Sequence, residues 1–163
     1  MSDRTKLDEE RSQFALLLAR LSLNNWDKVL WFDETTYNSF TCLKRSWSTR
    51  KDPNLHPRAK RRWNTTVYGT IGLPLGERNK YHYVKLGTST ERVQFLQYCK
   101  ELKAKLPYRF QHEKPILVLD NHPAHRGAAL EVLSKDFVVL YLPAYSCEFN
   151  SVEKLWSASK VRF

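Results

Sequence analysis

The chain has 163 residues, of which 42% are hydrophobic and 27% are charged, so its composition is that of a folded domain and excludes intrinsic disorder. Its formal net charge of +10 at pH 7 favours a polyanionic partner, nucleic acid first and an acidic membrane surface second, although a basic protein without either partner has the same composition. No apolar run approaches the ~20 residues of a membrane span, the N-terminus is too charged for a signal peptide, and Cys42, Cys99 and Cys147 lie too far apart for a disulfide framework or a zinc site.

Helical spacing of apolar residues predicts amphipathic helices, and short runs of β-branched and aromatic residues predict strands. In the first half of the chain these patterns predict a helix at 5–23, a buried strand at 29–33, strands at 36–43 and 65–71, and a short edge strand at 81–86. In the second half they predict a helix at 88–106 with Thr88 or Ser89 as its N-cap, a buried strand at 115–119, a helix at 124–134, a buried strand at 137–142 and a helix from 151 onward.

The order of these elements predicts an α/β fold with a mixed five-stranded sheet flanked by helices. The first strands can pair as an antiparallel meander, whereas two apolar runs separated by a helix are typical of parallel central strands. In this topology the strands that end at Asp33 and Asp120 are central neighbours, so we expect the two carboxylates to lie close together.

Glu153 is a third acid, because the first turn of the last helix can bring it to the same place. Three clustered carboxylates repel one another unless a cation lies between them, and Mg²⁺ prefers oxygen ligands and accepts phosphate oxygens. Two such ions ~4 Å apart can activate a nucleophile and stabilise the leaving oxygen in phosphoryl transfer. Each acid also has a structural explanation, since aspartates are common in turns and Asn150 with Glu153 forms a capping-box pattern.

Four segments carry motifs in a fixed order. They are a helix followed by Trp, Val and Asp-Glu at 11–34, a strand with a glycine at 67–71, Asp-Asn followed closely by His at 119–125, and Leu-Pro-Ala-Tyr-Ser followed by Asn-Ser-Val-Glu at 142–156. Together they resemble the mariner superfamily of transposases, within the larger DDE group, and the resemblance covers about residues 11–160.

The resemblance implies an RNase H-like fold, with a helix or linker at 1–25 leading into a catalytic domain at 26–163 whose last helix is truncated. It implies that Asp33, Asp120 and Glu153 hold Mg²⁺ or Mn²⁺, two ions in all, for cleavage and strand transfer in cut-and-paste transposition. Water cuts a DNA strand at the transposon end, and the exposed 3′-hydroxyl then attacks target DNA without a covalent enzyme intermediate.

The partners implied are transposon ends and target DNA, with a homodimer as an open possibility and with no membrane and no small-molecule substrate. We expect a soluble protein of a reducing compartment, which is the nucleus if the host is a eukaryote and otherwise the cytoplasm. A helix-turn-helix region is expected before the catalytic domain and is not in the sequence, so the chain is expected to be a fragment or a decayed relic.

The chain departs from the superfamily at Ser151, where proline is usual, and in a slightly short spacing from Asp120 to Glu153. Two alternatives therefore stay open. One is a catalytically inactive remnant that only binds nucleic acid. The other is a different RNase H-like nuclease, such as one acting on RNA–DNA hybrids, and the motif at 150–156 argues against it.

A basic segment at 44–62 is predicted to be a loop that contacts DNA phosphates. Its prolines indicate a loop, and Trp47 and Trp63, which bracket much of it, are expected in the core rather than stacked on bases. The basic residues are Lys44, Arg45, Arg50, Lys51, Arg58, Lys60, Arg61 and Arg62.

Polar residues near the acids are expected to support them. His122 and His125 suggest zinc, but no Cys or third His stands nearby, so orienting Asp120 or contacting phosphate is preferred. Asn121 and Asn150 are grouped with them as supporting residues. Trp156 is expected to anchor the last helix in the core, and Glu34 should point to the opposite side of its strand from Asp33.

Overall fold

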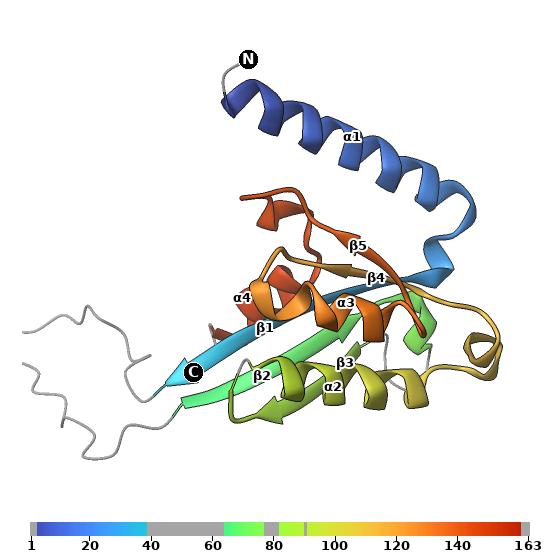
Figure 1. Ribbon diagram of the computed structural model, residues 1–163, viewed down its shortest axis with the longest axis vertical. Coiled ribbons are helices and arrows are strands. Elements are labelled where there is room, and N and C mark those ends of the chain that lie inside the picture. The colour runs from blue at the N-terminus through green and yellow to red at the C-terminus, as the bar shows by residue number, and fades with distance from the viewer. Residues whose placement is uncertain (1–2, 39–63, 77–81, 90, 161–163) are drawn as a thin grey trace, which may run out of the picture.

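The computed structural model describes residues 3–38, 64–76, 82–89 and 91–160, in which a mixed sheet lies between helices (Figure 1). The strands in chain order are β1 Val29–Asn38, β2 Asn64–Ile71, β3 His82–Gly87, β4 Ile116–Leu119 and β5 Val138–Tyr141. Their order in the sheet is β3-β2-β1-β4-β5, with β1, β2 and β3 antiparallel and β4 parallel to both β1 and β5. The predicted α/β fold with a mixed five-stranded sheet is therefore confirmed.

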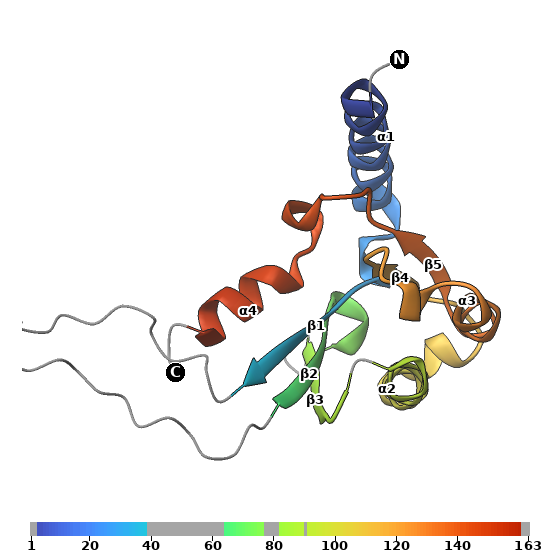
Figure 2. The ribbon, with the colours of Figure 1, turned by 60° about the vertical axis from the view of Figure 1, so that its left-hand side comes forward.

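The helices cover both faces of this sheet. They are α1 Asp3–Asn24, α2 Arg92–Lys105, α3 Ala128–Leu133 and α4 Val152–Lys160. Short 3-10 helices lie between the main elements at Trp26–Lys28, Leu73–Leu75, Tyr108–Gln111, Pro123–His125 and Cys147–Phe149. Figure 2 shows α2 and α3 on one side of the sheet and α4 on the other, with α1 projecting beyond β4 and β5.

One hydrophobic core lies on each face of the sheet, because successive side chains of β1 point to opposite faces. Leu30 and Phe32 point toward a core formed with α2 and α3, where Phe95, Leu102 and Leu133 are buried. The intervening residues, Val29 and Trp31, belong to a second core with Val152 and Trp156 of α4 and Phe14 of α1. The predicted role of Trp156 as a core anchor is confirmed, and α4 is thereby held against β1.

Two strand predictions were wrong. The segments predicted at 29–33 and 36–43 form one strand at least to Asn38, because no turn residue interrupts the pairing that runs from Trp31 with Ile71 to Asn38 with Asn64. The remainder of the second prediction, 39–43, lies outside the described residues. The strand at 137–142 was expected to be central, but β5 is at the edge of the sheet and Val138 is 52% exposed.

Two helix boundaries also differ from prediction. The helix expected from Thr88 begins at Arg92, and neither Thr88 nor Ser89 caps it, because the Gln94 side chain accepts hydrogen bonds from both of their backbone amides. The helix expected at 124–134 is shorter, since Gly127 with a φ of 61° separates a 3-10 turn from α3. In the described part of the chain, no helix combines the length and apolar character that crossing a membrane requires.

Candidate functional site

Asp33 and Asp120 lie side by side because β1 and β4 are parallel neighbours. The last pair in their register is Trp31 with Val118. Asp33 lies two residues after Trp31, and Asp120 lies two residues after Val118. Asp33 is part of β1, while Asp120 immediately follows β4. The expected proximity of the two strands is thus confirmed, and both carboxylates emerge at the same edge.

Asn150 fixes the start of α4 next to Asp33. This buried side chain donates from Nδ2 to the carbonyl oxygen of Phe32 at 3.1 Å, and its Oδ1 accepts from the Val152 amide at 3.3 Å. Asn150 therefore caps the helix as predicted. The other half of the capping box does not form, because the Asn150 amide donates to Cys147 O, and the Glu153 carboxylate is left for the site.

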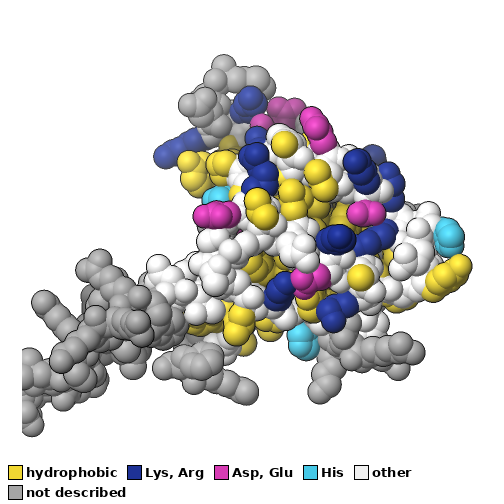
Figure 3. All heavy atoms as spheres, turned by 60° about the horizontal axis from the view of Figure 1, so that its bottom comes forward, with side chains coloured by type: hydrophobic (Ala, Val, Ile, Leu, Met, Phe, Trp, Pro, Cys, Tyr) yellow, Lys and Arg dark blue, Asp and Glu magenta, His cyan; other side chains and the backbone are white. Residues whose placement is uncertain are grey.

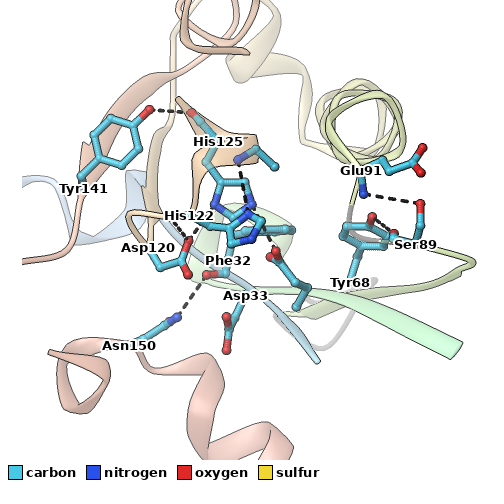
Figure 4. Close-up of polar contacts among 12 residues, drawn as sticks. Phe32, Asp33, Tyr68, Ser89, Glu91, Asp120, His122, His125, Tyr141 and Asn150 are labelled. Carbon is cyan, nitrogen blue, oxygen red and sulfur yellow. Dashed lines mark hydrogen bonds and ion pairs between the residues drawn. The ribbon is translucent and has the colours of Figure 1, made fainter. Parts of the chain in front are cut away.

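The three acids line a single cavity of about 390 Å³. Figure 4 shows Asp33 extending from β1 toward the start of α4, with Asp120 and His125 above it. The remaining lining residues are Asn121, His122, Leu142, Pro143, Ala144, Tyr145, Ser146, Cys147 and Asn150. The structure thus brings Asp33, Asp120 and Glu153, which are far apart in the sequence, to one cavity.

Burial and like charges together raise the pKa of Asp33 to about 7. Burial is the largest cause, followed by the negative charges of Glu153 and Glu34, while a hydrogen bond from Trp156 acts in the opposite direction. The Trp156 Nε1 donates to Asp33 Oδ2 at 2.9 Å. The carboxylates of Asp33 and Glu153, whose like charges raise the pKa of Asp33, fit a hard divalent cation such as Mg²⁺ or Mn²⁺.

Gly69 gives Trp156 the space that this hydrogen bond requires. It pairs with Asp33 across β1 and β2, and a Cβ at position 69 would lie 2.5 Å from the Trp156 ring. The glycine of the predicted strand at 65–71 therefore has a specific role, which is to let an indole ring lie directly on the sheet beside Asp33.

We expect Asp33→Asn to stabilise the metal-free protein at neutral pH. In the unfolded chain this carboxyl ionises near its ordinary pKa of 3.8, whereas in the folded protein it keeps its proton until about pH 7. The free energy of unfolding should therefore fall as pH rises from about 4 to 7, by roughly 2–4 kcal/mol, and Asn should remove this fall. Urea denaturation in EDTA across this pH range measures it.

The matched control is Asp8→Asn on the exposed surface of α1, which should keep the wild-type pH dependence. Added Mg²⁺ should stabilise the wild type more than Asp33→Asn, because a bound cation favours the ionised carboxylate. A wild-type unfolding free energy that is flat from pH 4 to 7 would contradict the assigned environment of Asp33.

His125 joins Asp120 to Glu34 beneath the cavity. Its Nδ1 lies 2.7 Å from Asp120 Oδ1, and its Nε2 lies 3.4 Å from Glu34 Oε1. The ring is 1% exposed and packs against Phe32 and Phe95. The expected role of His125 in orienting Asp120 is thus matched by a direct contact, and Glu34 points away from Asp33 as predicted.

The charges of this cluster shift its pKa values in opposite directions. Burial alone would raise the pKa of Asp120, but the hydrogen bonds from His125 and from the His122 amide lower it overall. Burial alone would lower the pKa of His125, but Asp120 and Glu34 raise it to about 9. At neutral pH the cluster is therefore an imidazolium held between two carboxylates.

Glu34, His122 and His125 could hold a metal ion in place of the proton on His125, with Glu34 as the third ligand that a zinc interpretation of the histidines lacked. One ligand atom each of Glu34, His122 and His125 lies within 4.8 Å of the others. The His122 Nδ1 accepts from the Ala124 amide at 3.3 Å, which leaves Nε2 as its ligand atom. These residue types suit a borderline metal ion, whereas the all-oxygen set of Asp33, Asp120 and Glu153 suits Mg²⁺.

Asn121 ties the loop after β4 to the end of β5. Its Nδ2 donates to Leu142 O at 2.6 Å, and its Oδ1 accepts from Arg126. The guanidinium of Arg126 lies 5.2 Å from the centre of the Tyr141 ring. The predicted supporting role of Asn121 is therefore structural, since it holds two walls of the cavity together.

The basic residues predicted to contact phosphates, from Lys44 to Arg62, lie outside the described residues, as do Trp47 and Trp63, which were expected in the core. Elsewhere, Lys and Arg side chains are interspersed with acidic and hydrophobic ones on the face shown in Figure 3. Three features of the site were not predicted from the sequence: the contact of Glu34 with His125, the hydrogen bond from Trp156 to Asp33, and the hydrogen bond from Arg11 to Ser146 in the cavity loop. For Glu34 the available clue was its place next to Asp33.

A family model described as DDE superfamily endonuclease matches residues 28–163. No curated protein matches the chain. Among solved structures, the Mos1 transposase paired-end complex with the left transposon end is similar at a TM-score of 0.70 and 17% identity, over 99% of this chain and 49% of that one. The chain thus spans about half the length of that transposase.

Two further solved structures are similar to this chain over nearly its whole length. The catalytic domain of Mos1 mariner transposase is similar at a TM-score of 0.64 and 16% identity, over 99% of this chain and 72% of that one. The Mos1 mariner paired-end complex with Mn is similar at a TM-score of 0.65 and 18% identity, over 98% of this chain and 48% of that one. At these identities the likeness shows the fold, which is the RNase H-like arrangement of a mixed five-stranded sheet between helices.

Proposed function

Because the chain belongs to the DDE superfamily endonuclease family, we propose that it acts as the catalytic part of a DNA transposase. The catalytic domain in this proposal is residues 26–163, and residues 1–25, which include α1, lead into it. The observation that carries the proposal is the convergence of Asp33, Asp120 and Glu153 on one cavity. The reaction is hydrolysis of a DNA phosphodiester, followed by strand transfer of the freed 3′-hydroxyl into target DNA.

Asp33, Asp120 and Glu153 would hold the metal ions, two Mg²⁺ or Mn²⁺. When bound, these ions supply charge neutralisation at the phosphate and activation of the attacking oxygen. The protein's own groups orient the three carboxylates: Trp156 holds Asp33, His125 holds Asp120, and Asn150 holds the start of the helix that carries Glu153. No side chain is needed as a covalent nucleophile.

Two features support DNA as the partner. The net charge of +10 suits a polyanion, and the structurally similar Mos1 transposase has been solved with a transposon end. We propose transposon ends and target DNA as the substrates, contacted through the basic residues of the segment 44–62. A second copy of the chain is a further proposed partner, since the similar structures include paired-end complexes.

Nicking of supercoiled plasmid DNA tests the proposal. The purified chain should convert supercoiled plasmid to the open circle in Mg²⁺ or Mn²⁺, and EDTA should stop the conversion. DNA binding without metal-dependent nicking would favour the inactive remnant. Preferential cleavage of an RNA–DNA hybrid would favour the other nuclease, and either outcome would overturn the proposed transposase activity.

A further inference from the structure

Tyr145 lines the cavity of the three carboxylates, and both its exposure and its backbone conformation are unusual. Its side chain is 91% exposed, and it lines the same cavity as Asp33, Asp120 and Glu153. Its φ is 51°, which among the described residues makes it the one non-glycine residue in the left-handed region. A bulky side chain is rarely found there, because its Cβ crowds the following carbonyl oxygen.

The backbone around Tyr145 is held in this conformation from both sides. The Ser146 hydroxyl, which is buried, donates to Ala144 O at 2.9 Å. Arg11 of α1 donates from Nε to Ser146 Oγ at 3.0 Å and from its guanidinium to Tyr145 O at 3.2 Å. Arg11 is also paired with Glu148, so the first helix and the 3-10 turn at Cys147–Phe149 clamp the loop.

A strained backbone that the surroundings enforce, combined with an exposed aromatic ring, is typical of a ligand contact rather than of packing. In water the ring loses the stabilisation that a buried tyrosine gains, so folding alone does not explain its orientation. Glycine or asparagine would suit the same backbone at less cost. The loop therefore presents an exposed aromatic ring beside the three carboxylates.

We propose that Tyr145 is a stacking platform for an unpaired nucleobase next to the scissile phosphate. This inference rests on the proposed function, because the neighbouring carboxylates then define where the phosphate lies. Within a duplex, each base is covered by its neighbours. A ring at the mouth of the cavity can therefore stack on a base only when that base has left the helix or ends a strand. Base–aromatic stacking is tolerant of sequence, so the platform would accept any base.

Fluorescence of 2-aminopurine measures this contact without requiring catalysis. Oligonucleotide duplexes carrying a nick, with a single 2-aminopurine placed beside the nick, are titrated with the protein in EDTA. Wild type and Tyr145→Phe should quench the fluorescence, because both keep the ring. Tyr145→Ala should lose the quenching and bind about tenfold more weakly, in line with the usual effect of removing one base–aromatic stack.

Two further variants separate a binding role from a structural one. Tyr108→Ala removes a ring that is 78% exposed in the 3-10 turn at Tyr108–Gln111 and does not line the cavity, so it should bind like the wild type. Tyr145→Gly should raise the melting temperature, because glycine tolerates a positive φ, and it should still lose the quenching.

Wild-type quenching and affinity in Tyr145→Ala would overturn the proposal, as would equal losses in Tyr108→Ala. A lower melting temperature in Tyr145→Gly would also overturn it, because the residue would then serve the fold. The outcome is distinct from that of plasmid nicking. A chain that quenches the fluorescence but does not nick plasmid would support the stacking role of Tyr145 and refute the proposed activity. A chain that nicks plasmid without quenching would support the activity and refute the stacking role.

Discussion

Asp120→Asn should abolish metal-dependent nicking of supercoiled DNA, with a loss of at least about a hundredfold. Replacing a residue that merely supports a metal ligand typically costs ~10–100-fold, so loss of a ligand itself should cost no less. The amide oxygen of Asn can still accept from His125 and from the His122 amide, which now contact Oδ1 at 2.7 and 3.0 Å. The fold should therefore survive, and the loss should lie in metal binding.

Asp27→Asn is the matched control for this substitution. Asp27 is a half-exposed aspartate whose partner is Arg109 at 2.8 Å, and it does not line the cavity. Such a surface ion pair contributes little, so Asp27→Asn should nick DNA at the wild-type rate. Circular dichroism and the melting temperature show whether each variant is folded. Folded Asp120→Asn with wild-type activity would remove Asp120 from the site.

His125→Ala should both destabilise the protein and impair cleavage. Loss of the imidazolium leaves Glu34 and Asp120 facing each other without a cation, and breaking a buried pair by removing one partner costs about 3–5 kcal/mol. The lower end of this range is expected, because the side chain of Asp120 is 47% exposed and partly screened by water. Asp120 would also lose the donor that fixes its orientation.

The effect of His125 on cleavage is expected to appear as a change in metal requirement. A variant that keeps a donor, His125→Asn, should need about 10–100-fold more Mg²⁺ for half-maximal nicking, and excess Mg²⁺ should restore its rate. His112→Ala, which removes an exposed histidine, should change neither stability nor metal requirement. An unchanged metal requirement in His125→Asn would refute the positioning role.

The pH dependence of this cluster has a definite sign. The folded pKa of His125 is raised to about 9 from an ordinary value of 6.5, so its contribution to stability is complete below about pH 6.5 and is lost as pH rises through 9. Glu34→Gln should weaken this dependence. If the purified protein instead carries stoichiometric zinc that Glu34→Gln releases, then Glu34, His122 and His125 form a metal site and the ion-pair description is wrong.

Local sequence patterns predicted most of the elements and the identity of the acids. The buried strand at 116–119 and the long helix at 3–24 follow from apolar runs and helical spacing, which depend on near neighbours in the chain. The position of Asp33 and Asp120 relative to those runs predicted that the two residues would be close. The ends of helices and strands were predicted less accurately, because the hydrogen bonds of Gln94 before α2 and the continuation of β1 past Asp33 depend on contacts beyond the local pattern.

The sequence by itself therefore determined the mixed α/β sheet, the three candidate carboxylates and the cationic character of the chain. The tertiary structure decided which residues serve those carboxylates. Trp156 reaches Asp33, and Arg11 reaches the loop of Tyr145, across more than a hundred residues of chain. Such contacts follow from how two faces of one sheet are packed, and neither residue spacing nor composition encodes that packing directly. The electrostatic consequence, an Asp33 whose pKa is about 7, exists only once packing buries this carboxyl close to Glu153 and Glu34.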